Sequence, residues 1–147
     1  MRLRLALTSL LAAACTSEPP PPDMRDPLSV ARAFVAAYNA KDLSRMLPLV
    51  DQVNMDAIRD ALTGGPESEA YQGIFAPDMV ALLASEGGRV EGPRYEGRDA
   101  VVKVGASKTG DVFTVELAKD RNERWIIVEN GTLTVEEFNS LPAQPPG

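Results

Sequence analysis

Residues 111–130 read DVFTVELAKDRNERWIIVEN, and this stretch decides the fold class. Phe113, Val115 and Leu117 occupy every second position of its first half, which is the period of a half-buried strand. A polar run, KDRNE, separates this segment from a second apolar strand at residues 124–130. Polar links of this length join neighbouring antiparallel strands. We therefore predict a β-hairpin here.

The segments on either side of this hairpin complete the prediction. The period of the apolar residues before position 86 is helical, and Asp26-Pro27 gives the first helix an N-cap followed by proline at its first position. The pattern Thr134-Val-Glu-Glu137 is typical of a capping box and opens a short final helix. Helices followed by an antiparallel meander define an α+β fold, in which the N-terminal helices pack on one face of a C-terminal antiparallel sheet of three to four strands. The predicted helices are residues 26–41, 42–47, 54–62 and 67–85, and Pro77-Asp78 offers a break and a restart within the last of these. The earlier strands are residues 89–95, at a sheet edge, and 99–106.

The last strand is apolar on both faces. Trp125 and Ile127 point to one side of it, and Ile126 and Val128 point to the other. Because both faces are apolar, we expect both to be covered. The helices cover one face, and either the C-terminal segment or a second protein surface covers the other.

The N-terminus has the form of a secretory signal. Arg2 and Arg4 precede an apolar run at residues 5–13, which is too short to span a bilayer. Three alanines then lead to Cys15, the only cysteine of the chain, and this junction resembles the bacterial lipobox. The resemblance implies cleavage before Cys15 and acylation of that residue. Ala12 stands where the lipobox usually has Leu, Val or Ile, so cleavage of the same bond by ordinary signal peptidase is the alternative.

A tether and one domain follow the predicted signal peptide of residues 1–14. Residues 15–25 hold the lipidated cysteine and a proline-rich spacer, which reaches about 30 Å when extended. Residues 26–141 form the single domain, and residues 142–147 form a flexible tail. Thr16 directly after the cysteine favours the periplasmic side of the outer membrane over the inner membrane.

The charge and the composition of the chain exclude several classes of partner and of active site. Loss of Arg2 and Arg4 with the signal leaves 13 basic and 21 acidic residues, a net charge of −8. An acidic domain is repelled by anionic lipid, so the acyl chains on Cys15 make the membrane contact. The acidic balance also argues against nucleic acid as a partner. The chain has no histidine, so triads and the usual zinc sites are absent. We predict no catalytic residue, no cofactor and no metal.

Two longer stretches resemble a known superfamily. PLSVARAFVAAYNAKDLSRMLPLV at residues 27–50 and VFTVELAKDRNERWIIVENG at residues 112–131 resemble the first helices and the final hairpin of nuclear transport factor 2-like domains. The resemblance implies a cone-shaped α+β domain with a pocket between helices and sheet. It makes Tyr38, near the end of the first helix, a candidate pocket residue. Phe113, Trp125 and Val128 are further candidates for the pocket or for an interface.

These observations favour a lipid-anchored protein of the bacterial cell envelope that binds a small ligand or a partner protein without catalysis. The alternative is a small enzyme of the same superfamily, in which Tyr38 and a strand carboxylate, Glu116 or Glu129, carry out acid–base chemistry. A third interpretation is a homodimer or envelope interaction module that associates through Trp125 or through the Ile126 and Val128 face.

Overall fold

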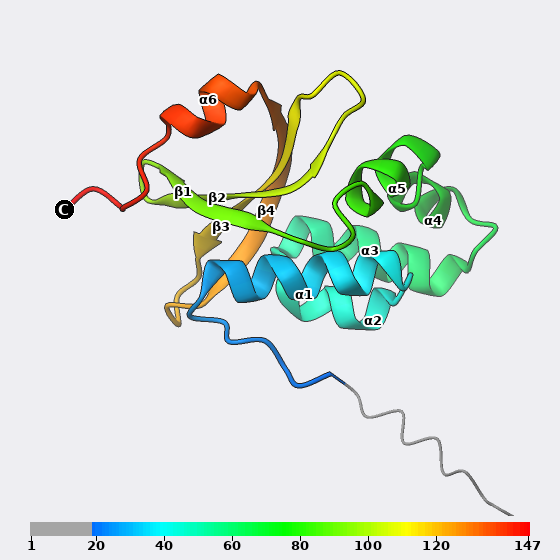
Figure 1. Ribbon diagram of the computed structural model, residues 1–147. Coiled ribbons are helices and arrows are strands. Elements are labelled where there is room, and N and C mark those ends of the chain that lie inside the picture. The colour runs from blue at the N-terminus through cyan, green and yellow to red at the C-terminus, as the bar shows by residue number, and fades with distance from the viewer. Residues whose placement is uncertain (1–18) are drawn as a thin grey trace, which may run out of the picture.

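The computed structural model describes residues 19–147 (Figure 1). The predicted signal peptide, residues 1–14, and the predicted lipidation site, Cys15, lie outside the described residues. The fold class is α+β, as predicted, with helices in the N-terminal half and a four-stranded antiparallel sheet in the C-terminal half.

The helices begin where side chains can satisfy free backbone N–H groups. The Asp26 carboxylate accepts a hydrogen bond from the Leu28 N–H at 3.0 Å, and the Thr134 hydroxyl accepts one from the Glu137 N–H at 3.1 Å. Both caps are the ones that the sequence predicts. The helices are α1 (Pro27–Asn39), α2 (Leu43–Met46), α3 (Gln52–Gly64), α4 (Glu69–Ile74), α5 (Pro77–Ala84) and α6 (Val135–Ser140), with a 3-10 turn at Leu47–Leu49.

The four strands form a simple meander in the order β1-β2-β3-β4, so β1 and β4 are the edges. The sheet is regular except at bulges. On β4, Ile127 pairs with Leu117 and Glu129 pairs with Glu116, so Val128 is an extra residue between them. The strands are β1 (Glu91–Glu96), β2 (Asp99–Ala106), β3 (Val112–Lys119) and β4 (Trp125–Leu133).

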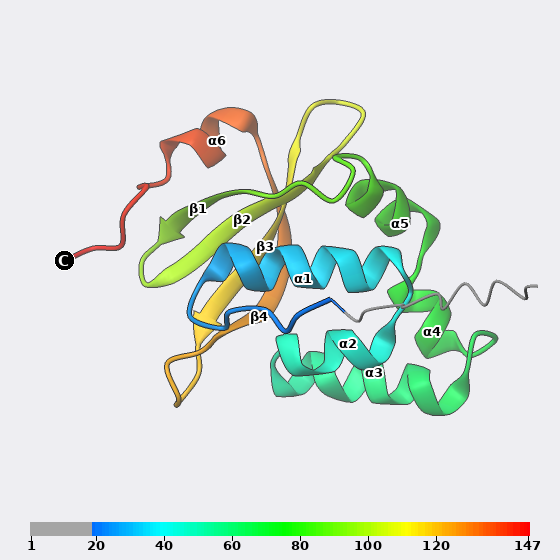
Figure 2. The ribbon, with the colours of Figure 1, turned by 60° about the horizontal axis from the view of Figure 1, so that its bottom comes forward.

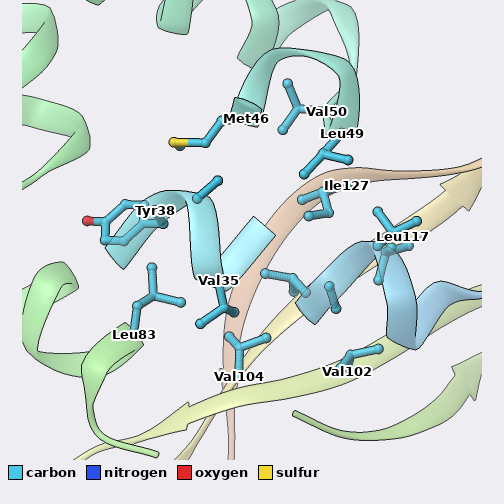
Figure 3. Packing of buried hydrophobic residues seen from close by; sticks show 14 of the residues in the cluster. Val35, Tyr38, Met46, Leu49, Val50, Leu83, Val102, Val104, Leu117 and Ile127 are labelled. Carbon is cyan, nitrogen blue, oxygen red and sulfur yellow. The ribbon is translucent and has the colours of Figure 1, made fainter. Parts of the chain in front are cut away.

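The main core lies between the sheet and the N-terminal helices. In Figure 2, α1 lies across the sheet, with α2 and α3 beside it. Figure 3 shows Val35 and Tyr38 of α1 packed with Val102 and Val104 of β2 and with Leu83 of α5. The alternate side chains of β3 that point this way are Phe113, Val115 and Leu117, as the period of the sequence predicts.

A second, smaller core covers part of the opposite face of the sheet. Phe138 of α6 packs against Val101 and Val112, and Figure 1 shows α6 on the side of the sheet away from α1. The C-terminal segment therefore covers this end of the face. Ile126 and Val128 are half-buried and belong to neither core.

Both ends of the domain reach further than the predicted boundaries. The Met24 carbonyl accepts a hydrogen bond from the Trp125 N–H at 2.7 Å, so the predicted tether joins the domain before residue 26. At the other end, the Tyr95 N–H donates to the Pro142 carbonyl at 2.9 Å. No helix within residues 19–147 is long and apolar enough to cross a membrane. Because both cores are made within these residues, a form of the protein that begins at Thr16 retains all of the described packing.

Candidate functional site

An apolar cavity of about 190 Å³ lies between the helices and the sheet. Its walls come from α1, α3, α4 and α5 on one side and from β3 and β4 on the other. The α4 and α5 segments form part of the wall because Pro77 ends one helix and begins the next, which turns the chain back towards the sheet. The cavity is lined by Phe34, Tyr38, Met46, Val50, Asn54, Ala57, Ile58, Gly73, Ile74, Met79, Leu83, Phe113, Val115, Ile127, Glu129 and Asn130.

Tyr38 forms part of the wall, and its hydroxyl is used within the fold. The Tyr38 hydroxyl donates a hydrogen bond to the Ile74 carbonyl at 2.7 Å, which ties α1 to α4. Its ring lies 5.0 Å from the ring of Phe75, centroid to centroid. Burial, with a smaller contribution from the charge of Asp78, raises the pKa of Tyr38 to about 12. A phenol with this pKa is a poor proton acceptor or donor near neutral pH.

The polar groups of the cavity gather at its mouth. The Asn54 side-chain amide donates to the Asp51 carboxylate at 2.6 Å and to the Val128 carbonyl at 3.1 Å, so it fixes α3 to β4. Asn130 is exposed, and no hydrogen bond to its side chain is found in the described part of the chain. Most of the lining is therefore apolar, with one free amide at the opening.

The structure brings together two of the four residues that the sequence names as candidates for a pocket or an interface. Tyr38 and Phe113 line the cavity, whereas Trp125 and Val128 do not. Trp125 is buried towards the other end of β4, with the ammonium group of Lys119 5.3 Å from the centre of its ring. Val128 is the bulge residue, and its carbonyl is held by Asn54.

The side chains of the two strand carboxylates point to the face of the sheet away from Tyr38, although Glu129 is also among the residues that border the cavity. Glu116 and Glu129 are direct cross-strand partners, and Asp99 lies beside them on β2. Burial and the hydrogen bonds and charges of Glu129 and Asp99 raise the pKa of Glu116 to about 7. Tyr38 and these carboxylates therefore do not form one catalytic site. Across residues 19–147, no group of three or more acidic, histidine or cysteine side chains is placed to hold a metal ion.

Sequence reasoning missed the part of the wall that comes from α3, α4 and α5. Gly73 is the clearest example, because a glycine inside a helix costs about 1 kcal/mol relative to alanine and so signals a packing or functional reason. Gly73 is exposed at the border of the cavity, and a Cβ atom built there would have no atom within 4 Å. Asn54 was also missed, although its position in the first turn of a helix next to Asp51 placed it close to a capping group.

Two larger hollows of about 370 and 420 Å³ lie at the surface. The first surrounds Lys103, whose ammonium group already pairs with Glu86 and Glu91 at 3.8 and 3.6 Å. The second follows the loops at the ends of α1 and α3. Of these three, the cavity beside Tyr38 has the most apolar lining, and this is the property that suits binding of an apolar group.

Comparison of the chain with protein-family models, with curated proteins and with solved structures finds no match. We therefore infer the chemistry of the site from its own geometry. Apolar walls, one free amide at the mouth and no assembled acid–base pair suit the binding of a small apolar group.

Proposed function

We propose that this protein is a lipid-anchored, non-enzymatic binding module of the bacterial cell envelope, and that the apolar cavity between its helices and its sheet is the binding site. The observation that carries the proposal is the cavity itself, with a volume of about 190 Å³ and a mainly apolar lining. Apolar cavities of about 150 Å³ accept molecules the size of benzene. The site thus suits a small apolar ligand or a single apolar side chain of a partner.

The membrane anchor in this proposal comes from the sequence. The lipobox-like junction before Cys15 and the prolines that follow it favour a domain held on a spacer at the membrane surface. A cavity between helices and an antiparallel sheet is also what a nuclear transport factor 2-like domain is expected to have, and this supports the proposed likeness.

The geometry favours binding over catalysis. The enzyme alternative needs a phenol and a carboxylate that act on one substrate, but Tyr38 and Glu116 face opposite sides of the sheet. The Tyr38 hydroxyl also donates its hydrogen bond to the Ile74 carbonyl. For these reasons we assign no catalytic role to either residue.

A pair of substitutions at Gly73 tests the cavity. In the form that begins at Thr16, Gly73→Leu adds a large side chain at the border of the cavity, where a new Cβ meets no atom, and Gly73→Ala gives a similar gain in helix propensity with a much smaller side chain. Indole serves as the probe. We expect indole to raise the melting temperature of the wild type and of Gly73→Ala, and to bind Gly73→Leu at least about tenfold more weakly. Equal responses from all three proteins would contradict the proposed site.

A separate experiment tests the anchor. In the full chain expressed in a bacterium, Cys15→Ala removes the proposed acylation site. We expect the wild type to stay with the membrane fraction after washing without detergent, and the variant to be found unprocessed or released. If the variant remains in the membrane fraction with the processed size of the wild type, acylation of Cys15 is not the anchor.

A further inference from the structure

The outer edge of β4 is covered by other segments of the chain along its first four residues. The Trp125 N–H donates to the Met24 carbonyl at 2.7 Å, and the Ile127 carbonyl accepts from the Asp51 N–H at 3.0 Å. The Asn54 amide then holds the Val128 carbonyl at 3.1 Å. After Val128 this cover ends, since within residues 19–147 no segment outside the sheet forms a hydrogen bond with the main chain of the rest of the outer edge. We call the remaining stretch of β4, residues 129–133, the open edge.

The bulge decides which backbone groups of the open edge face outwards. Trp125 and Ile127 turn their N–H and C=O groups away from β3, as their partners show. The extra residue at Val128 shifts the alternation by one position, so beyond it Asn130 and Thr132 turn theirs outwards. Between residues 19 and 147, no segment outside the sheet forms a hydrogen bond with the main chain of either residue.

On the opposite edge of the sheet, the C-terminal segment pairs with the part of β1 that lies across from Ile127 and Glu129. On β1, the Tyr95 N–H donates to the Pro142 carbonyl, and the guanidinium group of Arg94 donates to the Leu141 carbonyl at 3.2 Å. The C-terminal segment thus runs beside β1 and leaves β4 open. A free edge of this kind offers a row of main-chain donors and acceptors to another extended chain.

The open edge and the mouth of the cavity meet at the same residues. Glu129 and Asn130 border the cavity, and Gly73 of α4 borders it as well. Asn130 pairs with Val115, whose side chain lies on the helix-covered face of the sheet. Alternate side chains of a strand added beside Asn130 would therefore point towards the cavity.

We propose that the open edge binds an extended peptide segment of a partner protein, which adds to the sheet as a fifth strand and places one apolar side chain in the cavity. The proposal rests on the proposed function and names the occupant of the same site. The main chain of the peptide would exchange hydrogen bonds with Asn130 and Thr132, in the mode of strand addition. A cavity of about 190 Å³ suits an anchor side chain such as Leu or Phe.

The charge of the domain indicates which residues stand beside the apolar anchor in the peptide. The carboxylate of Glu129 lies at the open edge, and the chain without its signal has a net charge of −8. We therefore expect Lys or Arg beside the apolar anchor. The proline run at residues 19–22 of this chain is a poor occupant, because proline has no N–H to give to the edge.

The test uses a library of random heptapeptides displayed on phage, selected on the form of the protein that begins at Thr16. Enriched peptides are then synthesised, and their affinities are measured by fluorescence polarisation. Thr132→Pro removes an outward N–H, which an edge strand tolerates, and Thr132→Ala keeps it. We expect at least about tenfold weaker binding to Thr132→Pro and to Gly73→Leu, and unchanged binding to Thr132→Ala and Gly73→Ala.

A second measurement changes the peptide and keeps the protein in its wild-type form. Methylation of the amide nitrogens of an enriched peptide, one at a time, should abolish binding at alternate positions only, as strand pairing requires. The proposal is overturned if no peptide is enriched, or if the enriched peptides tolerate methylation at every position. If indole still binds the cavity in that case, the proposed function stands and only the peptide occupant is wrong. If indole also fails to bind, both are wrong.

Discussion

The carboxylate of Glu116 should make the stability of the domain depend on pH between about 4.5 and 7. Burial and the neighbouring Glu129 and Asp99 raise the pKa of Glu116 from 4.5 to about 7 in the folded state. Within this window the folded protein binds more protons than the unfolded chain, so the free energy of unfolding falls as the pH rises. The full shift corresponds to about 3 kcal/mol, and the partial exposure of Glu116 reduces the expected loss to about 1 kcal/mol.

Urea unfolding of the form that begins at Thr16, measured at intervals from pH 4.5 to pH 8, checks this expectation. Glu116→Gln removes the titrating group, so this variant should lose less stability than the wild type over the window and be the more stable protein at pH 8. Glu67→Gln is the matched control, because Glu67 is exposed in the loop before α4. If the wild type and Glu116→Gln show the same dependence on pH, the close pair of Glu116 and Glu129 carboxylates does not exist in solution.

Three further substitutions test the packing, each by urea unfolding. In Gly105→Ala, the new Cβ would meet the Leu82 carbonyl oxygen of α5, so we expect the free energy of unfolding to fall by about 1–3 kcal/mol. Gly73→Ala is the control and should not lower the free energy of unfolding. Phe138→Ala empties the second core, so we expect the free energy of unfolding to fall by about 3 kcal/mol and the Tyr95 amide to exchange its hydrogen faster. Unchanged exchange would contradict the packing of α6 on the sheet. Trp125→Ala should cost about 3–5 kcal/mol because Trp125 is buried in the main core, and an unchanged midpoint would place Trp125 at the surface.

The features that the sequence predicted correctly are those set by short-range chemistry. Asp26 and Thr134 cap helices because their side chains reach N–H groups two or three residues away. The alternation in β3 predicted which side chains, Phe113 among them, enter the main core. The class of fold followed from the order of these elements.

The features that the sequence did not predict depend on contacts between distant residues. Nothing local to Met24 indicates that its carbonyl pairs with Trp125, about a hundred positions later. The bulge at Val128 follows from the register of two strands, and it turns Asn130 outwards. The cavity likewise arises where α3, α4 and α5 meet the sheet, so of its lining only Tyr38, Phe113 and Glu129 were named in advance as candidate site residues, and Glu129 was named for its carboxylate and not for the pocket.

Native mass spectrometry of the full chain, extracted in mild detergent from the membranes of the bacterium that expresses it, tests the central claim most directly. The account predicts acyl chains on the protein, and a further bound molecule or peptide that dissociates on unfolding and is retained by the wild type and Gly73→Ala. Gly73→Leu should keep the acyl mass and lose the bound molecule. Unacylated protein, or a bound mass that Gly73→Leu retains in full, would contradict a lipid-anchored module that binds through this cavity.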